Sequence, residues 1–344
     1  MLDLTRELGI DHLIEVMHCG SSFTLRMHPG LQKERFADFD TARLEEDLQL
    51  ESAANALERE IWLAMLLSPV AFHYPGIAEL TASIRMRLNI VEAARRTSLA
   101  FHTSKIERPV DYWTHSEETG FTVLPGKSLL DALRQATQPE ASGRKYAFSC
   151  YRATEYVILL GIAQELESIN PGLLQRLQAR WERCAIASRK FHDTFMYEYG
   201  SLENPLPQKY YVPGDRVWFR NPDPHSSDVP GYEGSWVMYL GGGLFNNFWQ
   251  HDKPFSLNTK CIEVYHWRHG VYRDSEGNLQ MDESAVEEHV SATLKNPMET
   301  AQILERTMRM RDASGVYEQG GCIDASREYP RWVCPDTADI ILPD

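Results

Sequence analysis

Apolar residues recur at helical spacing through much of the first half of the chain. This spacing predicts four helices, over residues 41–67, 76–101, 127–136 and 171–187. Ser68-Pro69 ends the first of them, and Pro171 fits the first turn of the last. Residues 1–40 are mixed and indicate short helices and loops, whereas residues 106–124 indicate extended chain.

A further helix is predicted from Cys150 to Leu166, and it differs from the others in polarity. Its residues 156–163 are apolar nearly all round, so we expect this helix to be buried in a core. Ser142 and Gly143 precede it as turn residues, and the small side chain of Ser149 stands directly before the cysteine.

After about Pro205 the pattern changes from helical to extended. Short apolar runs bounded by glycine and proline predict strands over residues 217–219, 235–240, 244–249 and 261–267. Residues 283–312 are again helical, and residues 313–344 are rich in turn signals. Helices followed by strands are typical of the α+β class.

Charge and composition narrow the range of functions. The 344 residues carry a formal net charge of −14, which argues against nucleic acid as a partner because such binding needs a basic face. Arginines occur at positions 85, 87, 95 and 96 of one predicted helix, and they indicate a solvated face rather than a binding patch. No apolar run is long enough for a membrane span, and the first residues lack the pattern of a signal peptide. We therefore expect a cytoplasmic protein with no membrane partner and an unknown oligomeric state.

Cys150 is the strongest candidate for chemistry. The six cysteines have neither CxxC pairs nor regular spacing, so they indicate free thiols rather than a disulfide framework or a zinc site. A thiol at a helix N-terminus faces unpaired N–H groups and the positive end of the helix dipole, which lower its pKa and favour the nucleophilic thiolate. The alternative is a small cysteine that only packs.

Several segments resemble, in the same order, the protein-glutamine gamma-glutamyltransferases of spore-forming bacilli. They cover residues 69–74, 77–80, 87–94, 112–113, 125–128, 146–150, 214–222 and 237–241. In that family the nucleophile stands where this chain has Cys150. The resemblance implies an NlpC/P60-like (papain-like) α+β core over residues 69–275, flanked by helical extensions over 1–68 and 276–344.

The resemblance also implies a reaction and its partners. The thiolate attacks the side-chain amide of a protein glutamine, ammonia leaves, and a lysine amine resolves the thioester into an isopeptide cross-link. This reaction needs no cofactor, and its partners are proteins that carry glutamine and lysine. Two alternatives stay open: a cysteine hydrolase of the same fold (a deamidase or peptidase), and an inactive relative that acts as a binding protein.

The acid–base partner of Cys150 is less well defined. Family members have a glutamate where this chain has Ser235; Glu233 lies two residues earlier, and a bulge at Gly234 would bring it into the site. A histidine of the family is replaced by the segment around Asn247, and His251 follows a few residues later. Glu233 as a solvated loop carboxylate and His251 as a turn residue are the alternatives.

The remaining site predictions concern substrate contacts and metals. Ser149 replaces a glutamate of the family, and together with Ser235 and Asn247 it is expected to contact substrate. The aromatic residues expected to line an acyl tunnel are Trp113, Tyr232 and Trp236, although strand aromatics also form cores. His266 and His269 form a His-x-x-His pair with neither a predicted helix nor a third ligand, so we predict no metal.

Overall fold

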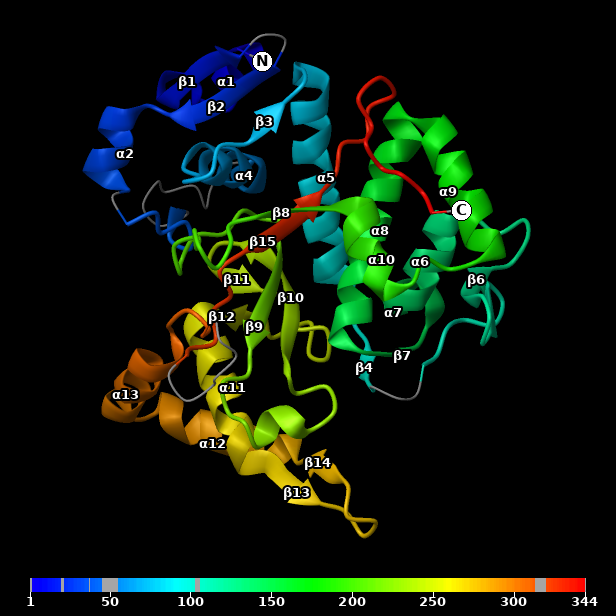
Figure 1. The fold of residues 1–344 in the computed structure, drawn as a ribbon, viewed down its shortest axis with the longest axis vertical. Helices are drawn as coiled ribbons and strands as arrows, with labels where there is room; N and C mark the ends of the chain where they lie inside the picture. Colours follow the sequence, from blue (N-terminus) through cyan, green and yellow to red (C-terminus); the bar gives the residue numbers. More distant parts are fainter. Residues whose placement is uncertain are drawn as a thin grey trace.

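The structure is a computed structural model that describes residues 2–19, 22–36, 38–44, 55–102, 106–312 and 320–343. It is a mixed α/β protein in which a six-stranded sheet lies between two groups of helices (Figure 1). The strand order is β12-β11-β10-β9-β15-β8. The strands are β8 (Met196–Tyr199), β9 (Arg216–Arg220), β10 (Gly234–Gly241), β11 (Leu244–Phe245), β12 (Phe255–Ser256) and β15 (Arg327–Pro330).

The alternation of side chains along β10 explains why both faces of the sheet are covered. Met238 and Leu240 belong to the same core as the helices α5 (Ile77–Arg96) and α8 (Cys150–Ile169). Val237 and Tyr239 point to the other face and pack in the core that contains α11 (Leu257–Gly270). A strand buried on both faces has few polar positions, as β10 does.

Helix α8 starts at Cys150, as the sequence predicts, and crosses α5 at close range. A Cβ atom added at Gly161 would lie 2.4 Å from Cγ1 of Ile90, so only glycine permits this approach. The other elements between residues 100 and 195 are β4 (Ala100–Phe101), β5 (Trp113–Ser116), β6 (Gly120–Val123), α6 (Leu129–Thr137), α7 (Pro139–Ser142), β7 (Ala147–Phe148), α9 (Pro171–Arg183) and α10 (Ser188–Phe195). Of these, α6, α9 and α10 add buried residues to the same core. Strands β5 and β6 confirm the extended character predicted over residues 106–124.

The strand predicted over residues 261–267 is wrong, because this segment lies in helix α11. Ser256 and Thr259 form a reciprocal capping box at its start, which satisfies backbone N–H groups that a strand would leave to a neighbour. The buried residues Leu257, Cys261 and Val264 follow helical spacing. The predicted strand over 244–249 also shortens to the two residues of β11.

The helices predicted after residue 283 are confirmed and pack against α11. They are α12 (Glu283–Leu294) and α13 (Pro297–Thr307), and the hairpin of β13 (Val271–Arg273) and β14 (Leu279–Met281) joins α11 to α12. A 3-10 turn, η3 (Ser226–Asp228), lies between β9 and β10. Helices α11, α12 and α13 form a distinct group beside the sheet (Figure 1).

The N-terminal segment contains a sheet that the sequence reading missed. An antiparallel hairpin of β1 (Ile14–Cys19) and β2 (Ser22–Met27) pairs with β3 (His73–Tyr74). The helical elements around it are α1 (Leu2–Glu7), η1 (Asp11–Leu13), α2 (Pro29–Arg35) and α4 (Ala56–Leu66). The helix predicted over 41–67 is thus confirmed only from Ala56 onward, because Thr41 lies outside a helix and residues 45–54 lie outside the described residues.

The C-terminal segment enters the central sheet. Strand β15 pairs with β8 over four residues and with β9 at Glu328 and Arg216. The chain after it crosses to the N-terminal end of α5. There Glu79 accepts hydrogen bonds from the backbone N–H groups of Val333 and Cys334. Residues expected to form an extension therefore supply a central strand and a cover for the main core.

The solvated arginine face predicted for α5 is wrong at Arg87. This side chain is fully buried and pairs with the equally buried Asp215, with 2.8 Å between Nη1 and Oδ1. Helix α5 packs against both the sheet and α8, so one arginine of the four points inward. Among the residues that the structure describes, no helix is both long and apolar enough to cross a membrane.

Candidate active site at the start of α8

The start of α8 is held in place by its cap and by a short strand. Ser149 is the N-cap residue, and its Oγ accepts a hydrogen bond from the backbone N–H of Arg152 at 3.4 Å. Just before it, Phe148 of β7 pairs in parallel with Phe101 of β4. The observed role of Ser149 is therefore to cap the helix that presents Cys150.

Cys150 faces the first half of β10, on the side of the strand away from β9. The backbone N–H of Asn221 donates to the carbonyl of Glu233, so the odd-numbered residues of this stretch bond to β9. Backbone groups alternate in direction along a strand, and the N–H of Trp236 therefore points away from β9. It points at the sulfur of Cys150, as does the N–H of Tyr151, and both hydrogen bonds favour the thiolate.

Burial nevertheless raises the pKa of the Cys150 thiol above its ordinary value. Loss of solvent around the sulfur is the largest influence and outweighs the two N–H groups and the positive charge of Lys260; the negative charge of Glu233 adds to the rise. The helix terminus alone therefore predicts the wrong net direction for the pKa of Cys150. The cost of burying a charged sulfur outweighs the effect of the helix dipole.

The raised pKa of the Cys150 thiol predicts how this residue reacts with iodoacetamide. At pH 7 its thiolate fraction should lie below the roughly 3% of an ordinary thiol, since its pKa is higher. The alkylation rate of Cys150, followed by mass spectrometry, should rise about tenfold per pH unit through pH 8. A cysteine in a short unstructured peptide is the reference. A rate already level at neutral pH would contradict the prediction.

Trp236 is fixed from three sides. Its ring stacks on Trp218 of β9, with 5.7 Å between ring centroids, and meets the edge of Tyr151. The guanidinium of the buried Arg216 lies 4.9 Å from its ring centroid. Arg216 is in turn paired with Glu328 of β15. The C-terminal strand therefore helps to hold Trp236, whose backbone N–H points at Cys150.

The β9–β10 register places Glu233 and Ser235. The ladder runs from Gly234 to Met238 in unbroken register, so Glu233 precedes the strand without the predicted bulge at Gly234. A Cβ atom at Gly234 would lie 2.3 Å from the indole nitrogen of Trp218, which explains the glycine. Ser235 is buried opposite Phe219, whereas Glu233 is exposed and its charge acts on the thiol.

The other predicted residues occupy different environments. His251 lies in an exposed turn after β11, and Asn247 stabilises the preceding turn because its Oδ1 accepts from the N–H groups of Trp249 and Gln250. Trp113 is a core residue whose indole N–H donates to the carbonyl of Ala132 at 2.9 Å. These contacts account for Asn247 and Trp113 without a substrate.

Tyr232 is one of a group of packed aromatic side chains near the thiol of Cys150. Its ring meets Phe101 of β4 and Trp267 of α11, and Phe101 also contacts the half-buried Trp249. The hydroxyl of Tyr232 donates to Glu283 at 2.7 Å, and burial together with this carboxylate raises the pKa of Tyr232. Phe101 and Trp249 were not predicted, because nothing in their local sequence points to Cys150.

Lys260 is the other residue that sequence reasoning missed. It is 3% exposed, its Nζ lies 2.7 Å from Oε2 of Glu263, and its ammonium lies 4.0 Å from the ring centroid of Phe255. Its charge favours the thiolate of Cys150. The lysine and Glu263 are three residues apart, a pairing that becomes visible only once residues 257–270 are identified as a helix.

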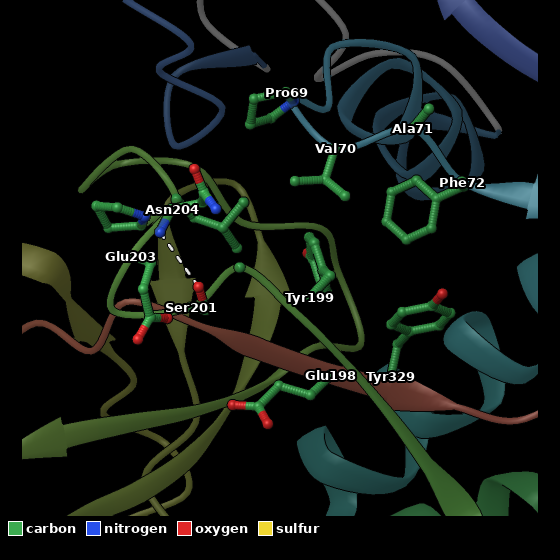
Figure 2. Close-up of a pocket in the computed structure, with 13 residues that line it drawn as sticks. Pro69, Val70, Ala71, Phe72, Glu198, Tyr199, Ser201, Glu203, Asn204 and Tyr329 are labelled. Atoms are coloured by element: carbon green, nitrogen blue, oxygen red, sulfur yellow. Dashed lines mark hydrogen bonds between the residues drawn. The ribbon is translucent and has the colours of Figure 1, made fainter.

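A separate cavity of about 790 Å³ opens in another part of the molecule (Figure 2). Its lining comes from residues 69–72, from β8 and the loop after it, and from Tyr329 of β15. The aromatic rings of Phe72, Tyr199 and Tyr329 gather on one side of this hollow. The cavity is therefore formed by elements other than α8 and β10, which present Cys150.

Comparison with known proteins agrees with the resemblance seen in the sequence. A sequence model of the protein-glutamine gamma-glutamyltransferase family matches residues 38–338. Proteins of that name from Halalkalibacterium halodurans and Bacillus subtilis are each 28% identical to this chain, over 201 and 186 residues. These alignments cover 55% and 50% of this chain.

The same alignments cover 62% of the Halalkalibacterium halodurans protein and 71% of the Bacillus subtilis protein. The chain therefore matches somewhat less than two thirds of the first of these relatives. The family match is broader, because it runs from before α4 to beyond β15 and so includes both the cysteine helix and the C-terminal strand. On this match, the chain belongs to the protein-glutamine gamma-glutamyltransferase family.

Proposed function

We propose that this protein cross-links other proteins by transferring the acyl group of a glutamine side chain to a lysine amine. The observation that carries the proposal is the position of Cys150 at the start of α8, where the N–H of Trp236 meets its sulfur, in a chain that matches this family over residues 38–338. We further propose that α8 and the sheet around β10 form an NlpC/P60-like core, within a catalytic domain of about residues 69–275 whose sheet is completed by β15.

In the first step the thiolate of Cys150 attacks the carbon of the glutamine amide. A tetrahedral oxyanion forms, its carbonyl re-forms as the C–N bond breaks, and ammonia leaves once its nitrogen has taken up a proton. In the second step a neutral lysine amine attacks the thioester, loses a proton, and expels the thiolate. The backbone N–H of Cys150 at the helix start is the proposed first donor to the oxyanion.

Separate side chains are proposed to accept the proton of the thiol and to stabilise the charge of the thiolate. Because burial favours the protonated thiol, a neighbouring base must take its proton when attack begins. Glu233 is the proposed base, since it is a carboxylate whose charge is felt at the sulfur; His251 is the second candidate. Lys260 stabilises the thiolate that forms.

The proposed substrate contacts follow from the same arrangement. Tyr232 and Trp236 flank the thiol and would line the path of the glutamine side chain, whereas Ser149, Ser235, Asn247 and Trp113 act by holding these elements in place. A protein with a formal net charge of −14 would also attract lysine-bearing partners over a distance set by the salt concentration.

The direct test is incorporation of a labelled primary amine into a glutamine-rich protein, with ammonia measured in the same tube. We expect ammonia release to match amine uptake. Ammonia released with little uptake would indicate that water resolves the thioester, which is the reaction of a deamidase. The absence of both products from the folded protein would contradict the proposal.

Glu233→Gln separates a catalytic carboxylate from a solvated one. Removing this charge should lower the pKa of Cys150 and speed its alkylation at fixed pH, because Glu233 raises that pKa. The rate of amine transfer should nevertheless fall, by about 10²–10⁴-fold for loss of a general base. Faster alkylation combined with slower transfer is the expected signature in rate measurements on the same preparation.

Two matched variants complete this test. Glu117→Gln removes an exposed carboxylate from the β5–β6 turn and should change neither rate. His251→Ala probes the second candidate. Transfer unchanged in Glu233→Gln but lost in His251→Ala would move the acid–base role to the histidine.

A further inference from the structure

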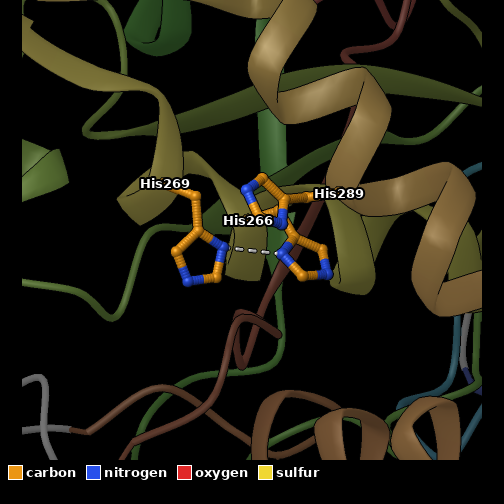
Figure 3. A group of neighbouring side chains, drawn as sticks. All are labelled: His266, His269 and His289. Carbon is orange, nitrogen blue, oxygen red and sulfur yellow. Dashed lines mark hydrogen bonds between the residues drawn. The ribbon is translucent and has the colours of Figure 1, made fainter.

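Three histidines from two helices converge on one side of the α11–α12 pair (Figure 3). His266 and His269 lie one turn apart on α11, and His289 faces them from α12. One ring nitrogen of each lies within 4.8 Å of those of the other two. The rings are close-packed, with centroids 4.5 Å apart for His269 and His289.

This arrangement removes both grounds on which the sequence argued against a metal. The His-x-x-His pair lies on a helix, so its two side chains project from the same face. A third histidine comes from a segment about twenty residues later, which sequence spacing alone could not bring to the pair. The prediction of no metal therefore followed from the strand wrongly predicted for residues 261–267 and from the separation of His289 from the pair along the chain.

A chain of hydrogen bonds fixes the proton of the buried His266. The hydroxyl of Thr293 donates to Oε1 of Glu299 at 3.1 Å, so its oxygen accepts a hydrogen bond from Nε2 of His266 at 2.8 Å. With its proton on Nε2, the neutral imidazole keeps a lone pair on Nδ1. That Nδ1 faces Nδ1 of His269 at 2.9 Å. A histidine oriented by a carboxylate through its second nitrogen is the usual arrangement behind a metal ligand.

The distances and exposure suit a small divalent ion. Two nitrogens bound tetrahedrally to zinc are about 3.3 Å apart, given Zn–N bonds of about 2.0–2.1 Å. His266 is 2% exposed and fixed, while His269 and His289 are exposed and have room to adjust.

We propose that His266, His269 and His289 bind one divalent transition-metal ion of the zinc class and so fasten α12 to α11. Three imidazoles leave a coordination position that water can fill at the surface. Nitrogen ligands favour zinc, nickel, cobalt or copper over calcium and magnesium. The bound ion would stiffen the helix that carries Lys260 and Trp267, and hence the layer of side chains behind Cys150.

The test is zinc binding to the full-length protein, freed of metal by a chelator and carrying no histidine tag. We expect one zinc ion per chain by titration against a chromogenic chelator, and a melting temperature raised by about 4 °C at zinc a hundredfold above Kd. His269→Ala and His289→Ala should each weaken binding at least about 100-fold; both sites are exposed, so folding should be unaffected. Thr293→Val should weaken it less, by about 10–100-fold.

Controls separate this site from other ligands in the chain. His115→Ala removes an exposed histidine on β5 and should leave zinc affinity unchanged, as should Cys150→Ala, which removes the reactive thiol. The cobalt(II) form should show the visible spectrum of nitrogen ligands without a thiolate charge-transfer band. Zinc affinity equal in His269→Ala, His289→Ala and His115→Ala would overturn the proposal, as would binding lost in Cys150→Ala.

Discussion

Cys150→Ala should abolish both amine incorporation and ammonia release, with a loss of at least about 10⁴-fold in the rate of transfer. The thioester cannot form without the sulfur, and neither Glu233 nor Lys260, whose charges act on that sulfur, supplies a thiol in its place. Rates are measured with the labelled-amine assay under conditions in which the wild-type reaction is linear.

Two controls make this loss interpretable. Residue 150 occupies the first position of α8, and alanine favours helix, so the variant should melt at nearly the wild-type temperature. Cys150→Ser keeps the size and the hydrogen bonds of the side chain but supplies a much weaker nucleophile. Transfer that survives in Cys150→Ala at wild-type stability would rule out the thioester mechanism.

The helix start at Cys150 could be predicted from sequence because its signals are local. A small residue, a cysteine and an apolar run predict the start of α8, and the observed helix begins at Cys150. The strands β9 and β10 were predicted for the same reason, since glycine and proline bound each apolar run. Their pairing then places the N–H of Trp236 at the sulfur.

What the sequence could not give depends on contacts between distant segments. Residues 261–267 read as a strand because their apolar spacing is ambiguous over so few residues, and the capping box at Ser256 was the signal that could have decided it. Because that helix was not predicted, the sequence also did not indicate Lys260 or the three-histidine cluster. Strand β15 was missed because a segment of four residues after a turn-rich stretch has too short a pattern to predict a strand.

Arg87 illustrates the same limit in electrostatics. Four arginines on one helix indicate a solvated face, because an unpaired buried charge is very costly. The partner that makes burial tolerable, Asp215, lies 128 positions further along the chain, in the loop before β9. The sequence around α5 therefore does not reveal that Asp215 is the partner of Arg87.

Arg87→Met should destabilise the protein by about 3–5 kcal/mol, a large share of the 5–15 kcal/mol typical of folded proteins. Arg87 and Asp215 are both fully buried, and the guanidinium also donates to the carbonyl of Pro213 at 3.1 Å. Methionine fills much of the space but leaves the Asp215 carboxylate buried without its cation. The free energy of unfolding is measured by urea titration.

Arg96→Met on the same helix is the matched control. Arg96 pairs with Glu140 at the surface, where both side chains are about half exposed, and such pairs contribute about 0–1 kcal/mol. Its free energy of unfolding should therefore stay near that of the wild type. Equal effects of the two substitutions would show that helix propensity, and not the buried pair, determines the loss.

The double variant Arg87→Met with Asp215→Asn shows where the loss originates. Asparagine can still accept the hydrogen bond that Asp215 receives from the N–H of Val212 at 2.9 Å, but it carries no charge. If the loss in Arg87→Met comes from an uncompensated buried charge, the double variant should recover most of it. If the loss comes instead from packing against Phe72 and Tyr329, which lie over the guanidinium and line the cavity of Figure 2, the double variant should be no more stable than Arg87→Met alone.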